Sequence, residues 1–157
     1  MKLDEIKREY EKLTKKYDLP NFEKLNSDFE VDKLEKETEN ILRSFRKLMM
    51  EKIVNSMTFL EMLVNPVNAP RMYLSYLRNM SIEDRKIIDD IYTALADLSL
   101  LSLDLEIDSN EKSEADLLKK GYEKWNSLKP GFRKILENMK KPNNNLNNLK
   151  KERSYFG

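Results

Sequence analysis

The chain has 157 residues, of which 29 are basic and 28 acidic, and it contains no histidine and no cysteine. Disulfides are therefore excluded, and so are histidine- or thiol-dependent catalysis and the His and Cys ligands typical of zinc sites. With 3 glycines, 5 prolines and abundant Leu, Lys and Glu, the composition favours long helices in a single domain that folds without a metal.

The N-terminal part is expected to form a helix and a connector. Apolar residues at spacings of three and four predict a helix over about 2–17. It ends at Asp18-Leu19-Pro20, because proline disfavours helical backbone in the residue before it. The connector over 19–30 should contain a short helix starting at Pro20. Its apolar side chains are expected to attach it to the core: Leu19, Phe22, Leu25 and Phe29.

The longest periodic segment predicts a helix over 31–64, about 50 Å long. Asp32 and Glu35 have the spacing of a reciprocal N-terminal cap, and Asn65-Pro66 ends the helix. A helix of this length typically forms the spine of a bundle. A rigid turn over 65–70 and a short helix over 71–79 follow.

Ser81 with Asp84 three residues later predicts the start of a helix over 82–106. Leu100, Leu103 and Ile107 lie opposite its main apolar stripe, so the second half of the helix is apolar nearly all round. Residues 101–107 also alternate as a strand does. We disfavour that alternative because leucine is not β-branched and no second strand is apparent. The main stripe contains Ile87, Ile91, Ala94, Leu98, Leu101 and Leu105.

The C-terminal third is expected to contain two helices and a tail. Ser113 with Asp116 predicts a capped helix over 114–127, Lys129-Pro130-Gly131 a break, and residues 132–139 a final short helix. Residues 141–157 are asparagine-rich, basic and too polar to pack, which predicts disorder. The fold class is therefore an all-α bundle of about five main helices, with one domain over 1–140. The side chains expected to face the core from 114–127 are Leu117, Leu118, Tyr122 and Trp125.

Carboxylate pairs are the remaining candidates for catalysis, namely Asp89-Asp90, Glu35-Glu39 and Asp104-Asp108. Acids on a helix surface are usually solvated, and none of these lies at the centre of an apolar stripe, where desolvation could raise its pKa. The glycines at positions 121, 131 and 157 form no phosphate-binding loop. We therefore expect a protein that is not an enzyme, with no cofactor and no metal.

The second apolar stripe supplies the leading functional hypothesis, because an exposed apolar stripe must be buried by something. The helix over 2–17, the helix over 114–127 or a second copy of the chain could cover it, and we favour the intramolecular answer slightly. The intermolecular answer predicts a protein-interaction or assembly module that forms a homodimer. Candidate interface residues are Leu100, Leu103 and Ile107, with Met50 and Met62 beside the seam of the long helix.

The alternative function is association with nucleic acid. Residues 65–108 carry 4 basic and 8 acidic groups, whereas residues 109–157 carry 12 basic and 6 acidic groups. Basic residues on one face of the long helix, together with a basic tail, could contact phosphates. Salt-bridged surface and a solvated tail are the competing interpretation. The candidate contacts are Arg43, Arg46, Lys47, Lys140, Lys141, Lys150, Lys151 and Arg153.

The first residues show no apolar run of a signal peptide, and no stretch approaches the ~18 apolar residues of a membrane span. We therefore expect a cytoplasmic protein that does not bind membranes. The segments 17–26, 41–47 and 59–66 together resemble a small family of uncharacterised all-helical archaeal proteins. The resemblance implies helices and carries no activity and no functional residue.

Overall fold

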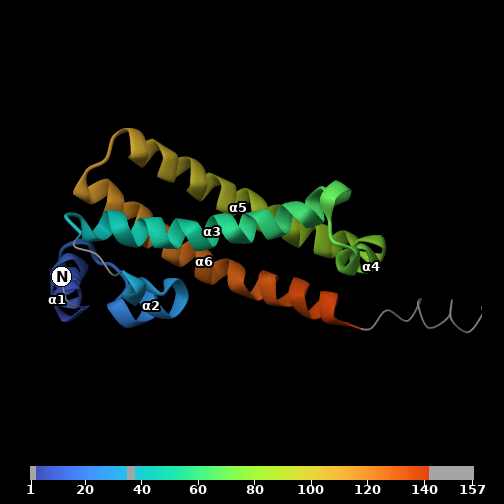
Figure 1. The fold of residues 1–157 in the computed structure, drawn as a ribbon, viewed down its shortest axis with the longest axis horizontal. Helices are drawn as coiled ribbons and strands as arrows, with labels where there is room; N and C mark the ends of the chain where they lie inside the picture. The colour runs from blue at the N-terminus through green and yellow to red at the C-terminus, as the bar shows by residue number, and fades with distance from the viewer. Residues whose placement is uncertain (1–2, 35–37, 142–157) are drawn as a thin grey trace, which may run out of the picture.

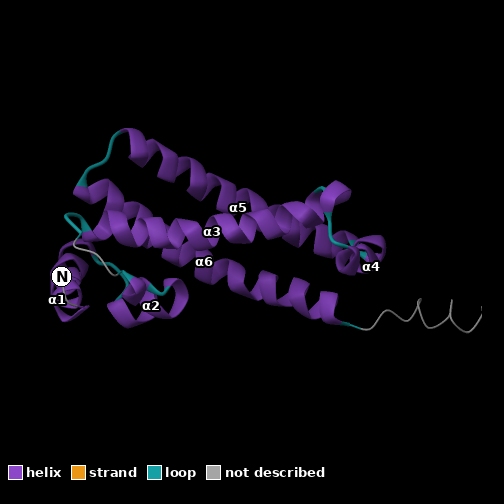
Figure 2. Ribbon diagram, viewed as in Figure 1, coloured by secondary structure: helices purple, strands orange, loops and turns teal. Residues whose placement is uncertain are grey.

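The computed structural model describes residues 3–34 and 38–141 of the chain. Every regular element in these ranges is helical, as Figure 2 shows, which confirms the all-α fold class. Residues 101–107 belong to a helix, so the strand alternative is wrong. In chain order the elements are α1 (Leu3–Tyr17), α2 (Phe22–Phe29), η1 (Val31–Lys33), α3 (Ile41–Val64), η2 (Pro66–Asn68), α4 (Arg71–Asn79), α5 (Ile82–Ile107) and α6 (Glu111–Lys140).

Helices α3, α5 and α6 form a three-helix bundle in which each helix packs against the other two. Figure 1 shows α5 running antiparallel to α3 and α6, with α1 and α2 at one end of the bundle and α4 at the other. The core continues into the N-terminal helices, where the connector residues Leu19, Phe22, Leu25 and Phe29 are all buried as predicted. No helix in the described ranges combines the length and apolarity needed to cross a bilayer.

The spine helix α3 begins at Ile41, so the predicted start at residue 31 is wrong. The Asn40 side chain accepts a hydrogen bond from the backbone N–H of Arg43 at 3.0 Å, which is the geometry of an N-terminal cap. Glu30, in the left-handed conformation with φ 52°, ends α2, and the following 3-10 turn buries Val31 completely. Residues 31–33 are thus held by core packing in a turn that cannot extend into α3. Glu35, the second residue of the predicted cap, lies outside the described residues.

Helix α6 continues through Lys129-Pro130-Gly131, so the predicted break is also wrong. Asn110, rather than Ser113, caps the helix, because its side chain accepts from the Ser113 N–H at 2.9 Å. A proline inside a helix costs roughly 3 kcal/mol through a lost hydrogen bond and a clash. Burial of Trp125 and Ile135 on either side of the proline offsets this cost.

The buried stripe of α5 is rotated from the predicted one, although its start is confirmed. The Ser81 hydroxyl accepts from the Asp84 N–H at 3.0 Å, as the sequence predicts. The stripe that faces α3 and α6 comprises Ile88, Ile91, Leu95, Leu98, Ser102 and Leu105. Ile87 and Ala94 are only half-buried, and Leu101 is exposed. The rotation places the polar Ser102 in the core, where it meets a charged partner from α3.

Candidate functional site

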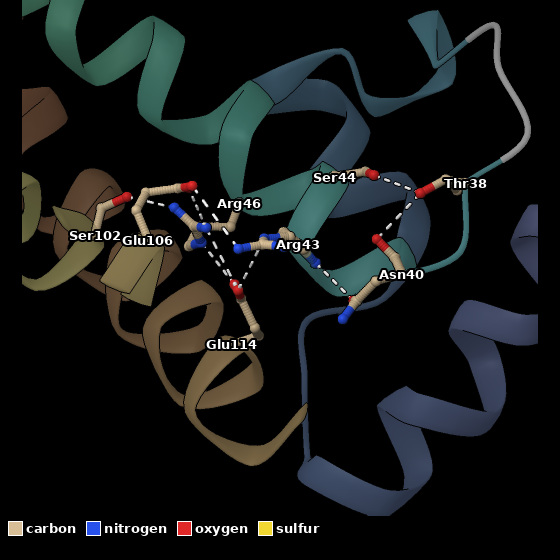
Figure 3. Close-up of polar contacts among 8 residues, drawn as sticks. All are labelled: Thr38, Asn40, Arg43, Ser44, Arg46, Ser102, Glu106 and Glu114. Carbon is tan, nitrogen blue, oxygen red and sulfur yellow. Dashed lines mark hydrogen bonds and ion pairs between the residues drawn. The ribbon is translucent and has the colours of Figure 1, made fainter. Parts of the chain in front are cut away.

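The most buried polar group of the described chain is an ion cluster that joins α3, α5 and α6 (Figure 3). At its centre Arg46, only 1% exposed, donates from Nε to Glu114 Oε2 at 2.5 Å. Its Nη1 donates to Ser102 Oγ and its Nη2 to Glu106 Oε1, both at 2.6 Å. Each terminal nitrogen of the guanidinium thus has an oxygen partner, which a buried cation requires.

Electrostatics keeps this cluster ionised. Burial by itself would lower the pKa of Arg46, but hydrogen bonds to Glu114 and Glu106 outweigh that effect and the net pKa is raised. The hydrogen bond from Arg46 also lowers the pKa of Glu106 below its ordinary value. Arg43 completes the cluster, with its Nε 3.8 Å from Glu114 Oε1. The cluster therefore ties three helices together with charged groups that already have partners.

Burial of Arg46 corrects the prediction that it contacts nucleic acid, because a side chain 1% exposed cannot reach a phosphate at the surface. Arg46 lies on the same buried face of α3 as Leu42, Met49 and Ile53, which are four, three and seven residues away. This helical spacing is the signal in the sequence that indicates burial of Arg46. Glu114, which is fully buried, was missed as well. It precedes Leu117 and Leu118 by three and four residues and therefore shares their inward face.

The other predicted nucleic-acid contacts do not gather in one place within the described residues. Arg43 is half-exposed and also lies 3.8 Å from Glu106, so acids accompany its charge. Lys47 is exposed near the first turns of α3, whereas Lys140 and Lys141 are exposed at the distant C-terminal end of α6 (Figure 1). The remaining candidates, Lys150, Lys151 and Arg153, lie outside the described residues.

An apolar ridge, defined here as Leu100, Leu103 and Ile107, lies on the outer face of α5. Their side chains are 62%, 61% and 86% exposed, so neither α1 nor α6 covers them and the favoured intramolecular answer is wrong. Spacings of three and four residues place them in one line along the helix. Exposed acids flank this line at Asp97, Asp104 and Asp108.

The two methionines predicted to belong to an interface do not extend the ridge. Met50 is 8% exposed and belongs to the buried set of α3, which corrects its assignment to a surface. Met62 is half-buried near the other end of α3. Because α3 packs on α5 as well as α6, the face beside its main seam is covered as well.

A groove of about 500 Å³ runs along the seam between α3 and α6. Its apolar lining consists of Phe59 from α3 and of Trp125, Phe132 and Leu136 from α6, and basic residues line it as well: Lys52, Lys129 and Arg133. The sequence did not predict the groove, because the expected break at Pro130 placed Trp125 and Phe132 on separate helices. On an unbroken helix, Trp125, Phe132 and Leu136 share one face, because they are seven and four residues apart. This spacing is the signal in the sequence that indicates an apolar face here.

The carboxylate pairs proposed for catalysis are dispersed. Asp89, Asp90, Asp104 and Asp108 are exposed on α5 and at its C-terminal end, and Glu35 lies outside the described residues. Among the described residues no group of three or more acids is arranged to hold a metal ion. The ridge and the groove are two surface features of this part of the chain that call for a functional explanation.

No protein-family model, no curated protein and no solved structure matches the chain. The resemblance to helical archaeal proteins therefore stays a prediction.

Proposed function

We propose that the protein is a non-catalytic assembly module that self-associates by burying the ridge of α5. The observation that carries the proposal is the exposure of Leu100, Leu103 and Ile107, each more than 60% accessible, in one line on a rigid helix. A contiguous apolar line of this kind, bordered by polar residues, is typical of an interaction surface. The opposite face of the helix is buried from Ile88 to Leu105 and packs against α3 and α6, so the ridge is preorganised for docking.

The ridge has enough apolar surface for a weak association. Full burial of a Leu or Ile side chain contributes about 1.5–3 kcal/mol, so burying the exposed fractions of the ridge contributes roughly 3–6 kcal/mol per copy. Association costs about 4–15 kcal/mol in lost translational and rotational freedom. The two magnitudes are comparable, so we expect assembly that depends on concentration rather than an obligate oligomer.

The dependence on salt distinguishes this proposal from association with nucleic acid. Burial of an apolar ridge supplies the stability of the assembly, so salt should not weaken it steeply. Binding to a phosphate backbone releases counterions and therefore weakens steeply as salt rises. Retardation of DNA or RNA at low salt that disappears at moderate salt would favour the nucleic-acid alternative.

The test is the mass of the full chain in solution, measured by light scattering over a wide range of concentrations. We expect the average mass to rise with concentration for the wild type and to stay at the monomer value for Leu103→Glu, which puts a charge in the middle of the ridge. Ile82→Glu is the matched control, because Ile82 is 89% exposed on the same helix but lies 18 residues from Leu100. A wild type that remains monomeric at the highest concentration, or equal loss of mass in Ile82→Glu, would refute the proposal.

A further inference from the structure

The groove between α3 and α6 is an unfilled stretch of a helix-packing seam. Helix α2 packs beside the first part of this seam, where Phe29 meets the Trp125 ring at a centroid distance of 5.9 Å. Beyond Trp125 the seam is open, and Phe59, Phe132 and Leu136 line it. Phe132 is half-buried and Leu136 is 41% exposed, so apolar surface remains free for another helix.

The ridge is short enough to lie within the groove. Leu100 and Ile107 are seven residues apart, which spans about 10 Å along α5. Trp125 and Leu136 are eleven residues apart, which spans about 16 Å along α6. Two turns of a helix that carries an apolar line therefore fit within the groove, in the manner of a helix bound in a groove.

Groove and ridge are also opposite in charge. Lys129 and Arg133 border the groove one helical turn apart, and Lys52 lies on the α3 side. Asp104 and Asp108, also four residues apart, border the ridge. Lys52 and Lys129 already bind Asp28 through its backbone carbonyl and its carboxylate, respectively. Arg133 is exposed and has no ion-pair partner among the described residues, so its charge remains available to an incoming acid.

We infer that the ridge of one copy docks in the groove of a second copy, so that the chain assembles head to tail. This inference rests on the proposed self-association and names the surface that receives the ridge. Pairing of two ridges would place acids against acids, whereas pairing of ridge with groove places Asp104 and Asp108 beside Arg133. The groove also supplies additional apolar contact area from Phe59, Phe132 and Leu136.

The positions of the two surfaces determine the form of the assembly. No residue of α5 lines the groove, and α5 packs against the other side of the α3–α6 pair, so ridge and groove lie on opposite faces of the bundle. Each copy can therefore offer its ridge to one neighbour and its groove to another. Such a heterologous contact produces a ring if the rotation closes and an open chain if it does not.

Two variants that each destroy one surface test the inference. Leu103→Glu disables the ridge, and Leu136→Glu disables the groove at a side chain exposed enough to change without opening the core. Each variant alone should remain monomeric in light scattering. An equimolar mixture should form a species of two subunits, because it combines one intact ridge with one intact groove, and it should grow no further. Circular dichroism of each variant verifies folding. Arg133→Glu is a milder groove variant, for which we expect about a tenfold weaker association.

Trp125 gives a second measurement, since it is the one tryptophan of the chain and it lines the groove. Its fluorescence should change with concentration in the wild type and in the mixture but not in either variant alone. If the wild type assembles and Leu136→Glu and Arg133→Glu assemble equally well, the ridge pairs with another surface and the inference is refuted while self-association stands. A mixture that stays monomeric also refutes it. A monomeric wild type instead refutes self-association itself.

Discussion

Replacing Glu114 with alanine is expected to leave the Arg46 guanidinium buried without its main counter-ion. Glu114 is fully buried and Arg46 is 1% exposed, and their closest contact is 2.5 Å. Arg46 therefore has little access to water in the folded protein. Ser102 and the 42% exposed Glu106 remain as partners, but neither contacts the Nε of Arg46. The variant therefore exposes the cost of an incompletely compensated charge in the core.

Removing one partner of a buried ion pair costs about 3–5 kcal/mol, compared with a total unfolding free energy of about 5–15 kcal/mol for a typical protein. Because Glu106 compensates part of the charge, we expect Glu114→Ala to lose about 3 kcal/mol. For a chain of this size that corresponds to a fall in Tm of roughly 6–12 °C. Glu106→Ala is the matched control and should lose only about 1 kcal/mol, because an exposed pair contributes little.

Urea unfolding followed by circular dichroism measures both variants against the wild type. The double replacement Arg46→Met with Glu114→Leu should recover most of the loss, since an apolar pair of similar volume has no charge to desolvate. A loss of less than about 1 kcal/mol in Glu114→Ala would refute the reasoning, because it would mean that the core solvates Arg46 without its partner. A double variant as unstable as the single one would refute it too.

Three further predictions concern stability and are checked by the same unfolding measurement. The pKa of Glu106 is lowered, mainly by its hydrogen bond with Arg46, so its contribution to stability is present above the ordinary pKa of 4.5 and is lost as pH falls through the folded value. The unfolding free energy of Glu106→Gln should therefore be lower than that of the wild type at neutral pH, and the two should converge in acid. Pro130→Ala should stabilise by about 1–3 kcal/mol, because it restores a backbone hydrogen bond donor inside α6; no gain would show that the helix is bent around the proline. Gly121→Ala should destabilise by about 1 kcal/mol, because overpacking exceeds the gain in helix propensity. The new Cβ would lie 2.4 Å from the Cε of the fully buried Met49, and combination with Met49→Leu should relieve the loss.

Helix caps and apolar spacing predicted the structure correctly where residues a few positions apart determine it. Ser81 caps α5 as predicted, because its hydroxyl reaches an N–H only three residues away. The connector residues Leu19 and Phe22 are buried as predicted, because the surrounding sequence offers few other apolar groups. The apolar line of Leu100, Leu103 and Ile107 was also identified from its spacing, but the expectation that another helix of the same chain covers it was wrong.

Contacts between helices distant in sequence determined the features that the sequence did not predict. Pro130 and Gly131 are helix breakers by local preference, yet a Cβ on Gly131 would lie 3.2 Å from both Ile87 and Ile91 of α5. Helices α5 and α6 approach closely at this point because Gly131 has no side chain. Burial of neighbouring residues offsets the local cost, because packing energies along a long helix exceed the preference of two residues.

The sequence by itself determined the all-α fold class, the absence of histidine and cysteine chemistry, and the apolar line on α5. The tertiary structure decided the starting residue of α3, the continuity of α6, the burial of Arg46 and the existence of the groove. The physical reason is range: periodicity and caps act over three or four residues, whereas Arg46 and Glu114 are 68 residues apart. A charged side chain predicted to be exposed can be buried in the core only when the fold places such a partner beside it.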